Sequence, residues 1–166
     1  MHYQKDDLII RSAESKDVSL LLTFIKELAE YEKLSQSVTA NEELLFNSFF
    51  GNDKSAEALI AEFKNEPAGM AIYFYNFSTF IGKPGIYLED LFVRQHLRGK
   101  NIGREILLQL IRIAKERNCG RVEWAVLNWN KPAIEFYKKL GAEPMDDWTV
   151  FRLTEDKINQ LSNQNI

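Results

Sequence analysis

LEDLFVRQHLRGKNIG, residues 88–103, is the stretch of sequence that decides the fold. Residues 86–93, IYLEDLFV, are apolar, aromatic and β-branched apart from one acidic pair, which predicts a strand buried on at least one face. The turn RGKNIG follows at 98–103, and REILLQLIRIAKER then begins an amphipathic helix. A strand that passes through a glycine-containing turn into a helix leaves backbone N–H groups without acceptors at the positive end of the helix dipole. With Arg98, Lys100 and Arg104 around it, this turn is suited to bind a phosphate.

The same turn has a plainer interpretation. A strand–helix turn with two glycines is common in α/β proteins that bind nothing there. The spacing is neither the GxxxxGK[ST] of a Walker loop nor the GxGxxG of dinucleotide-binding proteins. Further residues are therefore needed to favour a phosphate site over a structural turn.

Composition bounds the class of protein. The 166 residues, 45% hydrophobic and 27% charged, predict a single globular domain over residues 1–166 with its own core. A net charge of −3 disfavours a general nucleic-acid surface. Cys119 is the only cysteine, and His2 and His96 are far apart, so no metal site is expected. No stretch is apolar enough for a membrane span and no hydrophobic signal region is present, so a cytoplasmic location is expected.

Periodicity along the chain predicts alternating strands and helices. Ser15 is expected to cap a first helix, and Thr39 with Glu42 has the spacing of a capping box for a second. Asn130 is expected to cap a later helix that ends at Gly141. Strands are expected at 8–11, 58–63, 68–77, 86–93, 121–127 and 148–153, the second and third joined by a hairpin turn at 64–67, and a long helix at 102–117. This order predicts a mixed α/β fold, with an antiparallel front and a β-α-β unit behind.

Two groups of side chains have alternative interpretations. The first helix ends with Glu27, Glu30 and Glu32, which form either a solvated face or a negative rim that attracts a cationic substrate. The strand at 68–77 and the loop after it are rich in aromatic residues, which suit core packing or, less simply, the lining of an amine site.

Two motifs together resemble those of the GNAT superfamily of acetyl-CoA-dependent N-acetyltransferases. The phosphate-loop motif Q/R-x-x-G-x-G/A aligns with Arg98, Asn101 and Gly103. The later motif Asn-x-x-Ala-x-x-Phe-Tyr, ending in glycine, aligns with Asn130, Ala133, Phe136, Tyr137 and Gly141. The order and separation of both motifs also match, which neither motif alone would establish.

The similarity extends over nearly the whole chain and narrows the family. The segments IRSAESKDVSLLLTFIKELAEYEKL, STFIGKPGIYLED and VLNWNKPAIEFYKKLGA resemble the spermidine/spermine N-acetyltransferase branch, and KELAEYEKLS resembles its thialysine N-acetyltransferase relatives in particular. Asn101 replaces the usual loop glycine, but asparagine tolerates positive φ and keeps its N–H. Ser78 and Phe80 stand where the polyamine enzymes have Asp and Trp, which puts long-polyamine specificity in doubt.

The resemblance implies how acetyl-CoA would bind. The N–H groups of the loop would hold the pyrophosphate, the backbone of 91–93 would pair with the pantetheine arm and polarise the thioester carbonyl, and Asn130 would bond the pantetheine amide or simply cap its helix. The implied donor-binding residues are Leu91, Phe92, Val93, Arg98, Gly99, Lys100, Asn101, Ile102, Gly103, Arg104, Asn130 and Ala133.

The resemblance also implies catalytic roles. A lysine-like ammonium has a pKa near ~10.4, so the amine must lose a proton before it attacks. Glu89 matches the family's base, acting directly or through water, and its structural alternative is a carboxylate satisfied at a strand bulge. Tyr137 matches the tyrosine that protonates the departing thiolate, and its alternative is a core aromatic. Asp90 is expected to face away from Glu89, where it would hold a second substrate charge or make a structural hydrogen bond.

Substrate contacts are implied at Tyr31, Glu32, Phe80, Asp90 and Trp124, and the resembling enzymes are homodimers. Glu32 and Asp90 would favour a small diamine, polyamine or lysine-like amino acid. Two other functions remain open at this level. A protein N-acetyltransferase would need an open groove, and a non-catalytic CoA-binding module would not need both Glu89 and Tyr137.

Overall fold

The computed structural model describes residues 2–163. Its contacts divide the chain into two compact units, Met1–Ala125 and Val126–Ile166. The single domain expected over residues 1–166 stays a prediction.

The first unit is built on a six-stranded sheet in which the strands lie in chain order, β1-β2-β3-β4-β5-β6. Neighbouring strands are antiparallel except for β5 and β6, which are parallel. The mixed α/β sheet, antiparallel in front with a β-α-β unit behind, is therefore confirmed. The strands are β1 His2–Lys5, β2 Leu8–Ser12, β3 Glu57–Phe63, β4 Glu66–Ser78, β5 Lys83–Val93 and β6 Val122–Trp124.

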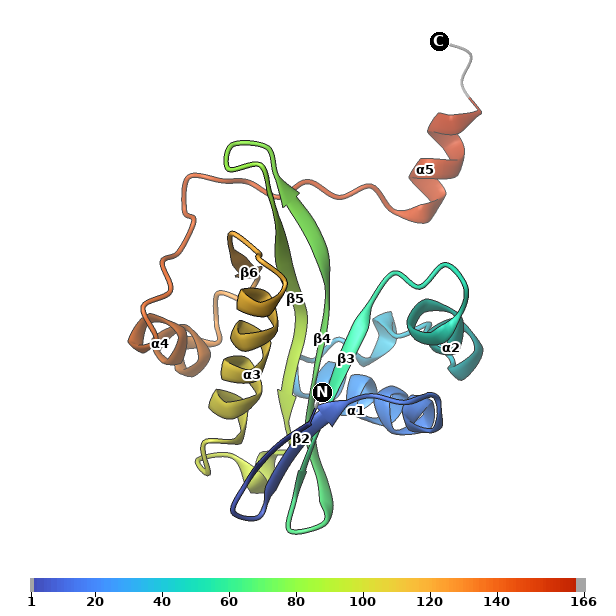
Figure 1. Cartoon of the computed structure of the whole chain (residues 1–166). Helices are drawn as coiled ribbons and strands as arrows, with labels where there is room; N and C mark the ends of the chain where they lie inside the picture. The colour runs from blue at the N-terminus through green and yellow to red at the C-terminus, as the bar shows by residue number, and fades with distance from the viewer. Residues whose placement is uncertain (1, 164–166) are drawn as a thin grey trace. The chain divides into compact units, whose positions relative to one another are not determined.

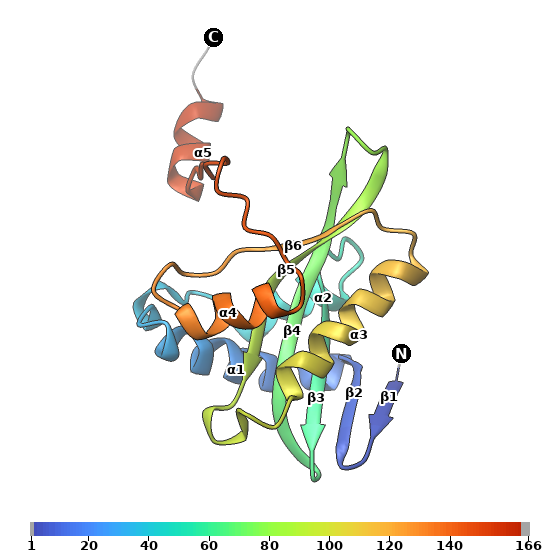
Figure 2. The same ribbon diagram turned by 90° about the vertical axis from the view of Figure 1, so that its left-hand side faces the viewer.

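Helices cover both faces of this sheet. Helices α1 (Val18–Tyr31) and α2 (Glu42–Phe50) lie on one face and α3 (Ile102–Glu116) lies on the other (Figures 1 and 2). The core beneath α1 and α2 includes the side chains of Phe24, Met70 and Phe92, each at most 4% exposed. Strand β5 packs between both helical layers, and the stretch 88–103 runs from this strand through the turn at 94–101 into α3.

The β3–β4 hairpin confirms the turn expected from sequence. Lys64 and Asn65 have φ values of 53° and 63°. Two adjacent residues with positive φ are typical of the tight turns whose twist matches that of a hairpin. The hairpin places the β3–β4 turn at the same end of the sheet as the turn before α3 (Figure 1).

Two predicted helix caps are wrong, although the helices themselves are confirmed. Ser15 lies inside a short 3-10 turn, Ser15–Asp17, whose N-cap is Glu14 and whose last residue, Asp17, forms a capping box with Glu14. Asn41 rather than Thr39 caps α2, because its side chain accepts the N–H of Leu44 at 2.9 Å. In both places a neighbouring polar residue has the extended backbone that a cap needs.

Three strand predictions also need correction. Strand β1 was not expected, because its sequence HYQK is polar and exposed and shows no alternation. Strand β6 covers Val122–Trp124 and not the whole of 121–127. Residues 148–153 form no strand. The side chains of these residues favour a strand, but a strand forms only where a neighbouring strand can accept and donate its backbone hydrogen bonds.

The second unit contains α4 (Lys131–Lys139) and α5 (Glu155–Ser162). The Asn130 side chain accepts the N–H of Ala133 at 3.3 Å, which confirms the predicted cap. At the other end Gly141 has φ 86°, and the N–H of Ala142 donates to the Tyr137 carbonyl at 3.2 Å, closing the helix as predicted. Within residues 2–163, no helix combines the length and apolar character that a membrane span requires.

Candidate active site

The turn before α3 has the backbone conformation that a phosphate loop needs. Gly99 and Asn101 both have left-handed backbones, with φ values of 78° and 62°. Asparagine therefore adopts the conformation for which the family motif usually uses glycine. The first N–H that bonds within α3 is that of Glu105, to the carbonyl of Asn101 at 3.0 Å. The preceding N–H groups of the first turn lack helical acceptors, and the side chain of Asn101 does not cap them.

The three cations around the turn differ in what they contact. Arg98 donates through Nε to the Val93 carbonyl at 3.1 Å, and its guanidinium lies 4.0 Å from the centre of the Tyr31 ring. The ammonium of Lys100 lies 5.2 Å from the Phe63 ring. Arg104 lies 3.6 Å from the carboxylate of Glu105. Arg98 is thus used partly to hold the loop, whereas Lys100 and Arg104 are exposed cations beside it.

Glu89 occupies a bulge in β5. The β4–β5 register passes from Ile72 opposite Asp90 to Tyr73 opposite Leu88, which leaves Glu89 as the extra residue. The extra residue reverses the alternation of side chains along the strand. Leu88 therefore shares a face with Tyr73, whereas Asp90 and Phe92 share the opposite face with Ile72 and Met70. Simple alternation, from which we expected Asp90 to face away from Glu89, does not apply across a bulge.

The edge of β5 is open beyond this bulge. Strand β6 pairs with β5 only at Ile86, Tyr87 and Leu88. Among residues 2–163 no strand pairs with that edge farther along. The two strands thus separate next to Glu89, as a bound chain-like ligand would require.

The backbone amides of Leu91 and Val93 point toward this open edge. The N–H of Arg94 donates to the Ala68 carbonyl of β4 at 3.0 Å. Since successive amides of a strand point to opposite sides, the amide of Val93, and that of Leu91 before it, face away from β4. Phe92 instead has its amide toward β4 and its side chain buried in the core. Of the three residues predicted to pair with the donor, the geometry is therefore suitable at Leu91 and Val93.

Three carboxylates gather at the bulge. Burial, together with the negative charges of Glu89 and Glu32, raises the pKa of Asp90 to about 6. Burial likewise raises the pKa of Glu32, at the end of α1. Like charges held together in a partly buried site are stabilised by a bound cation. The structure therefore brings together three of the predicted site residues in a group suited to an ammonium.

Replacement of Asp90 by asparagine is expected to stabilise the free protein at pH 7.5 by about 1–3 kcal/mol, because it removes a carboxylate whose folded-state pKa is raised. A raised pKa means that the folded state binds the proton more tightly than the unfolded state does, so stability declines as pH rises from about 4 to 6. The advantage of Asp90→Asn should fall to about a third at pH 4.5. Urea denaturation at both pH values measures it, and an advantage independent of pH would contradict this explanation.

The other predicted substrate residues lie at different distances from the carboxylates. Trp124 is the β6 neighbour of Leu88 and so lies where β5 and β6 separate. Tyr31 is at the end of α1 and packs against Arg98 of the loop. Phe80 is 92% exposed near the tip of the β4–β5 hairpin. Phe80 lies in the turn beyond Ser78 and Lys83, the last pair of the hairpin. Lys83 is six residues before Glu89 on β5, so Phe80 lies roughly 20 Å along the hairpin from Glu89.

The residues of the second motif lie in the second unit. Tyr137 is half-buried, its ring centre is 5.2 Å from that of Phe136, and burial raises its pKa to about 12. A phenol with this pKa stays protonated at neutral pH and so retains a proton to donate. Asn130 uses its side-chain oxygen to cap α4, which leaves its amide hydrogens for other partners.

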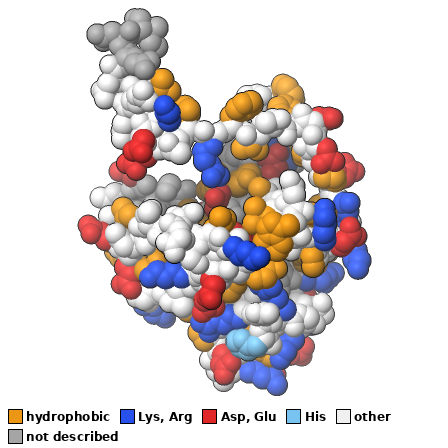
Figure 3. Space-filling view, turned by 180° about the vertical axis from the view of Figure 1, so that it is seen from behind, with side chains coloured by type: hydrophobic (Ala, Val, Ile, Leu, Met, Phe, Trp, Pro, Cys, Tyr) orange, Lys and Arg blue, Asp and Glu red, His pale blue; other side chains and the backbone are white. Residues whose placement is uncertain are grey.

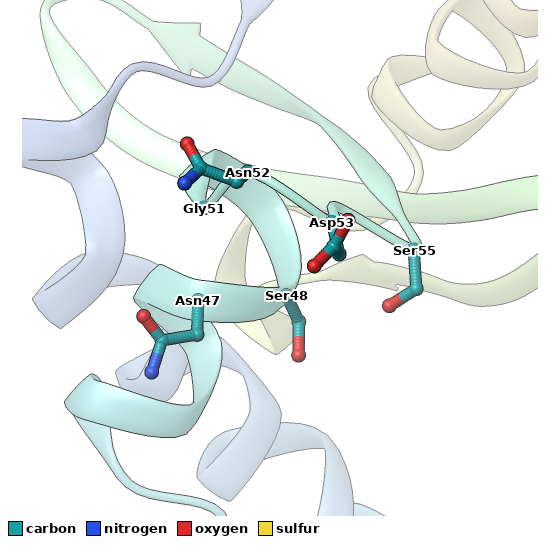
Figure 4. Close-up of a pocket in the computed structure, with 6 residues that line it drawn as sticks. All are labelled: Asn47, Ser48, Gly51, Asn52, Asp53 and Ser55. Atoms are coloured by element: carbon teal, nitrogen blue, oxygen red, sulfur yellow. The ribbon is translucent and has the colours of Figure 1, made fainter.

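A pocket of about 310 Å³ lies apart from these residues in the sequence. It is lined by polar residues at the end of α2 and before β3, namely Asn47, Ser48, Gly51, Asn52, Asp53 and Ser55 (Figure 4). None of them belongs to the predicted site.

Among residues 2–163 no group of three or more His, Cys, Asp or Glu side chains is placed to hold a metal ion. Acidic and basic side chains are interspersed on the face in Figure 3, unlike the continuous basic surface that nucleic acid requires.

Sequence reasoning missed one residue next to the loop. Arg94 directly follows β5 and pairs with Glu27 of α1 through two contacts, at 2.8 and 3.0 Å. Glu27 was expected to belong to a solvated face or a negative rim, and it is instead paired. No spacing rule links residues so far apart in sequence. The available signal was a cation between the strand and the turn at 98–103.

The fold, the open strand edge and the phosphate-type turn are together the features expected of a CoA-dependent acyltransferase. The chain matches the acetyltransferase (GNAT) family over residues 22–142, and it belongs to this family. It is therefore an acetyltransferase, and acetyl-CoA is the co-substrate of its family.

Individual relatives agree with this assignment. Thialysine N-epsilon-acetyltransferase of Bos taurus is 35% identical over 168 aligned residues, which cover 95% of this chain and 98% of the bovine protein. L-ornithine N5-acetyltransferase of Arabidopsis thaliana is 38% identical over 99 residues, or 60% of this chain and 43% of the plant protein. An integron cassette protein from V. cholerae is similar in structure, with a TM-score of 0.79, 27% identity, and coverage of 96% of this chain and 100% of that one.

Proposed function

We propose that this enzyme transfers the acetyl group of acetyl-CoA to the terminal primary amine of a small dicationic or zwitterionic molecule. Thialysine- or ornithine-like amino acids and short diamines are the class that fits best. The observation that carries this proposal is the group of Glu32, Glu89 and Asp90 beside the open edge of β5. Relatives that act on thialysine and L-ornithine support it, since both of these amino acids carry an amine at each end.

The first step of the proposed mechanism is binding of both substrates. The amides from Arg98 to Arg104 hold the pyrophosphate, and those of Leu91 and Val93 hold the pantetheine arm and the thioester oxygen. Asp90 and Glu32 bind the distal ammonium. This leaves the amine to be acetylated beside Glu89, which is exposed and free to reach it directly or through water.

Acyl transfer then follows. Glu89 accepts a proton from the ammonium, and the neutral nitrogen attacks the thioester carbon. The carbon–sulfur bond breaks as the carbonyl re-forms, and Tyr137 gives its proton to the departing thiolate. The acetylated nitrogen then loses its second proton, which restores the Tyr137 hydroxyl. A donor amide at the developing oxyanion contributes about 10²–10³ in rate by comparison with measured cases.

A second charge on the substrate is expected to matter for recognition. We expect 1,4-diaminobutane to be acetylated with a kcat/KM at least about 10-fold above that of n-butylamine, because the two differ only in the ammonium that Asp90 and Glu32 would bind. Asp90→Asn should bring this ratio toward one while changing the rate with n-butylamine by less than about 3-fold. Release of free thiol from acetyl-CoA measures both rates, and equal rates in the parent would contradict the proposal.

The rival functions are tested by the same assay. A panel of thialysine, lysine, ornithine, spermidine, spermine, short diamines and peptides distinguishes a small-molecule enzyme from a peptide acetyltransferase. Loss of turnover in Glu89→Gln and Tyr137→Phe with donor binding intact would support the catalytic roles. Binding of acetyl-CoA without turnover on any amine would instead indicate a CoA-binding interaction module.

A homodimer and a cytoplasmic location remain predictions. The homodimer is implied by the resemblance and is tested by sedimentation, and the location is expected from the sequence and is tested by cell fractionation.

A further inference from the structure

Arg94 joins three parts of the first unit at the point where β5 ends. Its guanidinium donates to both carboxylate oxygens of Glu27 on α1, at 2.8 and 3.0 Å. It also donates to the Pro67 carbonyl beside the β3–β4 turn at 3.0 Å. The guanidinium carbon, Cζ, lies over the ring of Phe24, 5.0 Å from the ring centre, and Phe24 is fully buried. Each kind of N–H group that the guanidinium has, Nε, Nη1 and Nη2, is thus bonded within the protein.

This arrangement differs from an ordinary surface ion pair. The side chains of Arg94 and Glu27 are only 26% and 33% exposed. The fork-to-carboxylate geometry fixes direction as well as distance. The backbone of Arg94 is held too, because its N–H donates to the Ala68 carbonyl at 3.0 Å. Both the backbone and the side chain are therefore fixed at the first residue of the segment that leads to the phosphate-binding turn.

A second contact on the same helix face reinforces the first. Glu27 and Tyr31 are four residues apart on α1 and so lie one turn apart on the same face. Arg94 and Arg98, also four residues apart, contact them in the same order, Arg98 resting 4.0 Å from the Tyr31 ring centre. The buried Leu97 lies between the two arginines and packs the turn against the core. Two arginines thus hold the segment 94–98 against α1.

We infer that Arg94, through Glu27, is a positioning residue for the acetyl-CoA site. By holding the segment 94–98 on α1, it orders the amides of the following turn before the donor arrives. A loop that must be ordered on binding loses affinity, and pre-ordering recovers it. This inference rests on the proposed phosphate site at 98–104. Because the guanidinium is already occupied, Arg94 acts through the loop and not as a phosphate ligand.

The test compares two acetyl donors on the 166-residue chain. Acetyl-CoA carries the pyrophosphate, whereas S-acetylpantetheine lacks it but has the same reacting thioester. In Arg94→Met, which keeps the packing against Phe24, we expect the KM for acetyl-CoA to rise about 10–100-fold, with kcat within about 3-fold of the parent. The kcat/KM for S-acetylpantetheine should change by less than about 2-fold. Glu27→Gln should reproduce this pattern, and the double variant should be no worse than either single variant.

Arg117→Met supplies a matched control. Arg117 forms a similar two-contact pair with Glu57, at 2.6 and 2.9 Å, beyond the C-terminal end of α3. It should alter stability without altering the ratio of kcat/KM between the two donors. An equal loss with both donors in Arg94→Met would overturn the inference, since it would show a general structural role. If Arg94→Met does not fold, Glu27→Gln decides by the same ratio.

A loop variant separates this inference from the proposal on which it rests. If Gly103→Asp leaves the donor ratio unchanged, the phosphate site itself is wrong. If Gly103→Asp abolishes the preference for acetyl-CoA and neither Arg94→Met nor Glu27→Gln changes it, only the positioning role is wrong.

Discussion

Replacement of Gly103 by aspartate is expected to raise the Kd and KM for acetyl-CoA at least about 100-fold while leaving the free protein as stable as the parent. A Cβ at position 103 would meet only Val93 Cγ2, at 3.5 Å, which is an ordinary contact. Packing in the free protein therefore does not require glycine. Gly103 lies in the first turn of α3, where a negative side chain is favourable by about 0.3–1 kcal/mol.

The same carboxylate would oppose a bound pyrophosphate. Two unit charges 4 Å apart repel each other by about 4 kcal/mol at an effective dielectric constant of 20, which is more than enough for the expected loss. The two effects of one substitution thus have opposite signs. If Gly103 were needed only for the fold, its replacement would lower the stability of the free protein. Unchanged stability with a lost affinity for acetyl-CoA would therefore indicate a binding role.

Calorimetric titration with CoA and thermal unfolding with and without CoA measure the two effects separately. The parent should be stabilised by CoA according to the ratio of ligand concentration to Kd, and Gly103→Asp should not be. Gly103→Ala is the control, because the family motif accepts alanine there, and its Kd should stay within about 3-fold. Tight CoA binding by Gly103→Asp would place the pyrophosphate elsewhere.

The parts of the fold that sequence predicted well are those that local signals determine. The period of α3, the positive-φ pair at Lys64 and Asn65 and the ends of α4 all depend on residues that are neighbours in the chain. Strand 148–153 was predicted from its residues alone and is absent, because a strand depends on a partner as well as on propensity. The opposite error occurred at β1. No strand was predicted there because the sequence is polar, but pairing with β2 forms one.

The site shows the same division. The phosphate-type turn could be read from Arg98 to Gly103, and the left-handed Asn101 agrees with that interpretation. The bulge at Glu89 could not be located, because it exists only in the register between β4 and β5. The Arg94–Glu27 pair joins residues 67 positions apart, which no local pattern reveals. Residues whose backbone conformation is set locally were therefore easier to predict than those whose position depends on long-range contacts.

Tyr137→Phe is expected to lower kcat with acetyl-CoA by about 10²-fold, near the lower end for positioned acid catalysis, with little change in KM. The substitution keeps the aromatic ring that packs beside Phe136 and removes only the hydroxyl. Since burial holds the pKa of Tyr137 at about 12, the hydroxyl is protonated throughout the range in which the amine substrate becomes neutral. The parent should therefore gain activity with rising pH and show no loss from ionisation of Tyr137 below about pH 11.

A change of leaving group distinguishes acid catalysis from packing at Tyr137. The thiolate of CoA gains from a proton as it departs, whereas the thiolate of an acidic aromatic thiol such as thionitrobenzoate departs readily without one. If Tyr137 is the acid, Tyr137→Phe should be slowed about 10²-fold with acetyl-CoA but less than about 5-fold with the acetyl thioester of thionitrobenzoate, each compared with the parent. Equal slowing with both donors would show that the hydroxyl shapes the site without donating the proton. Because Phe136→Leu changes the neighbouring ring and leaves the hydroxyl, it should slow both donors by the same factor, and so it provides the reference for a packing effect.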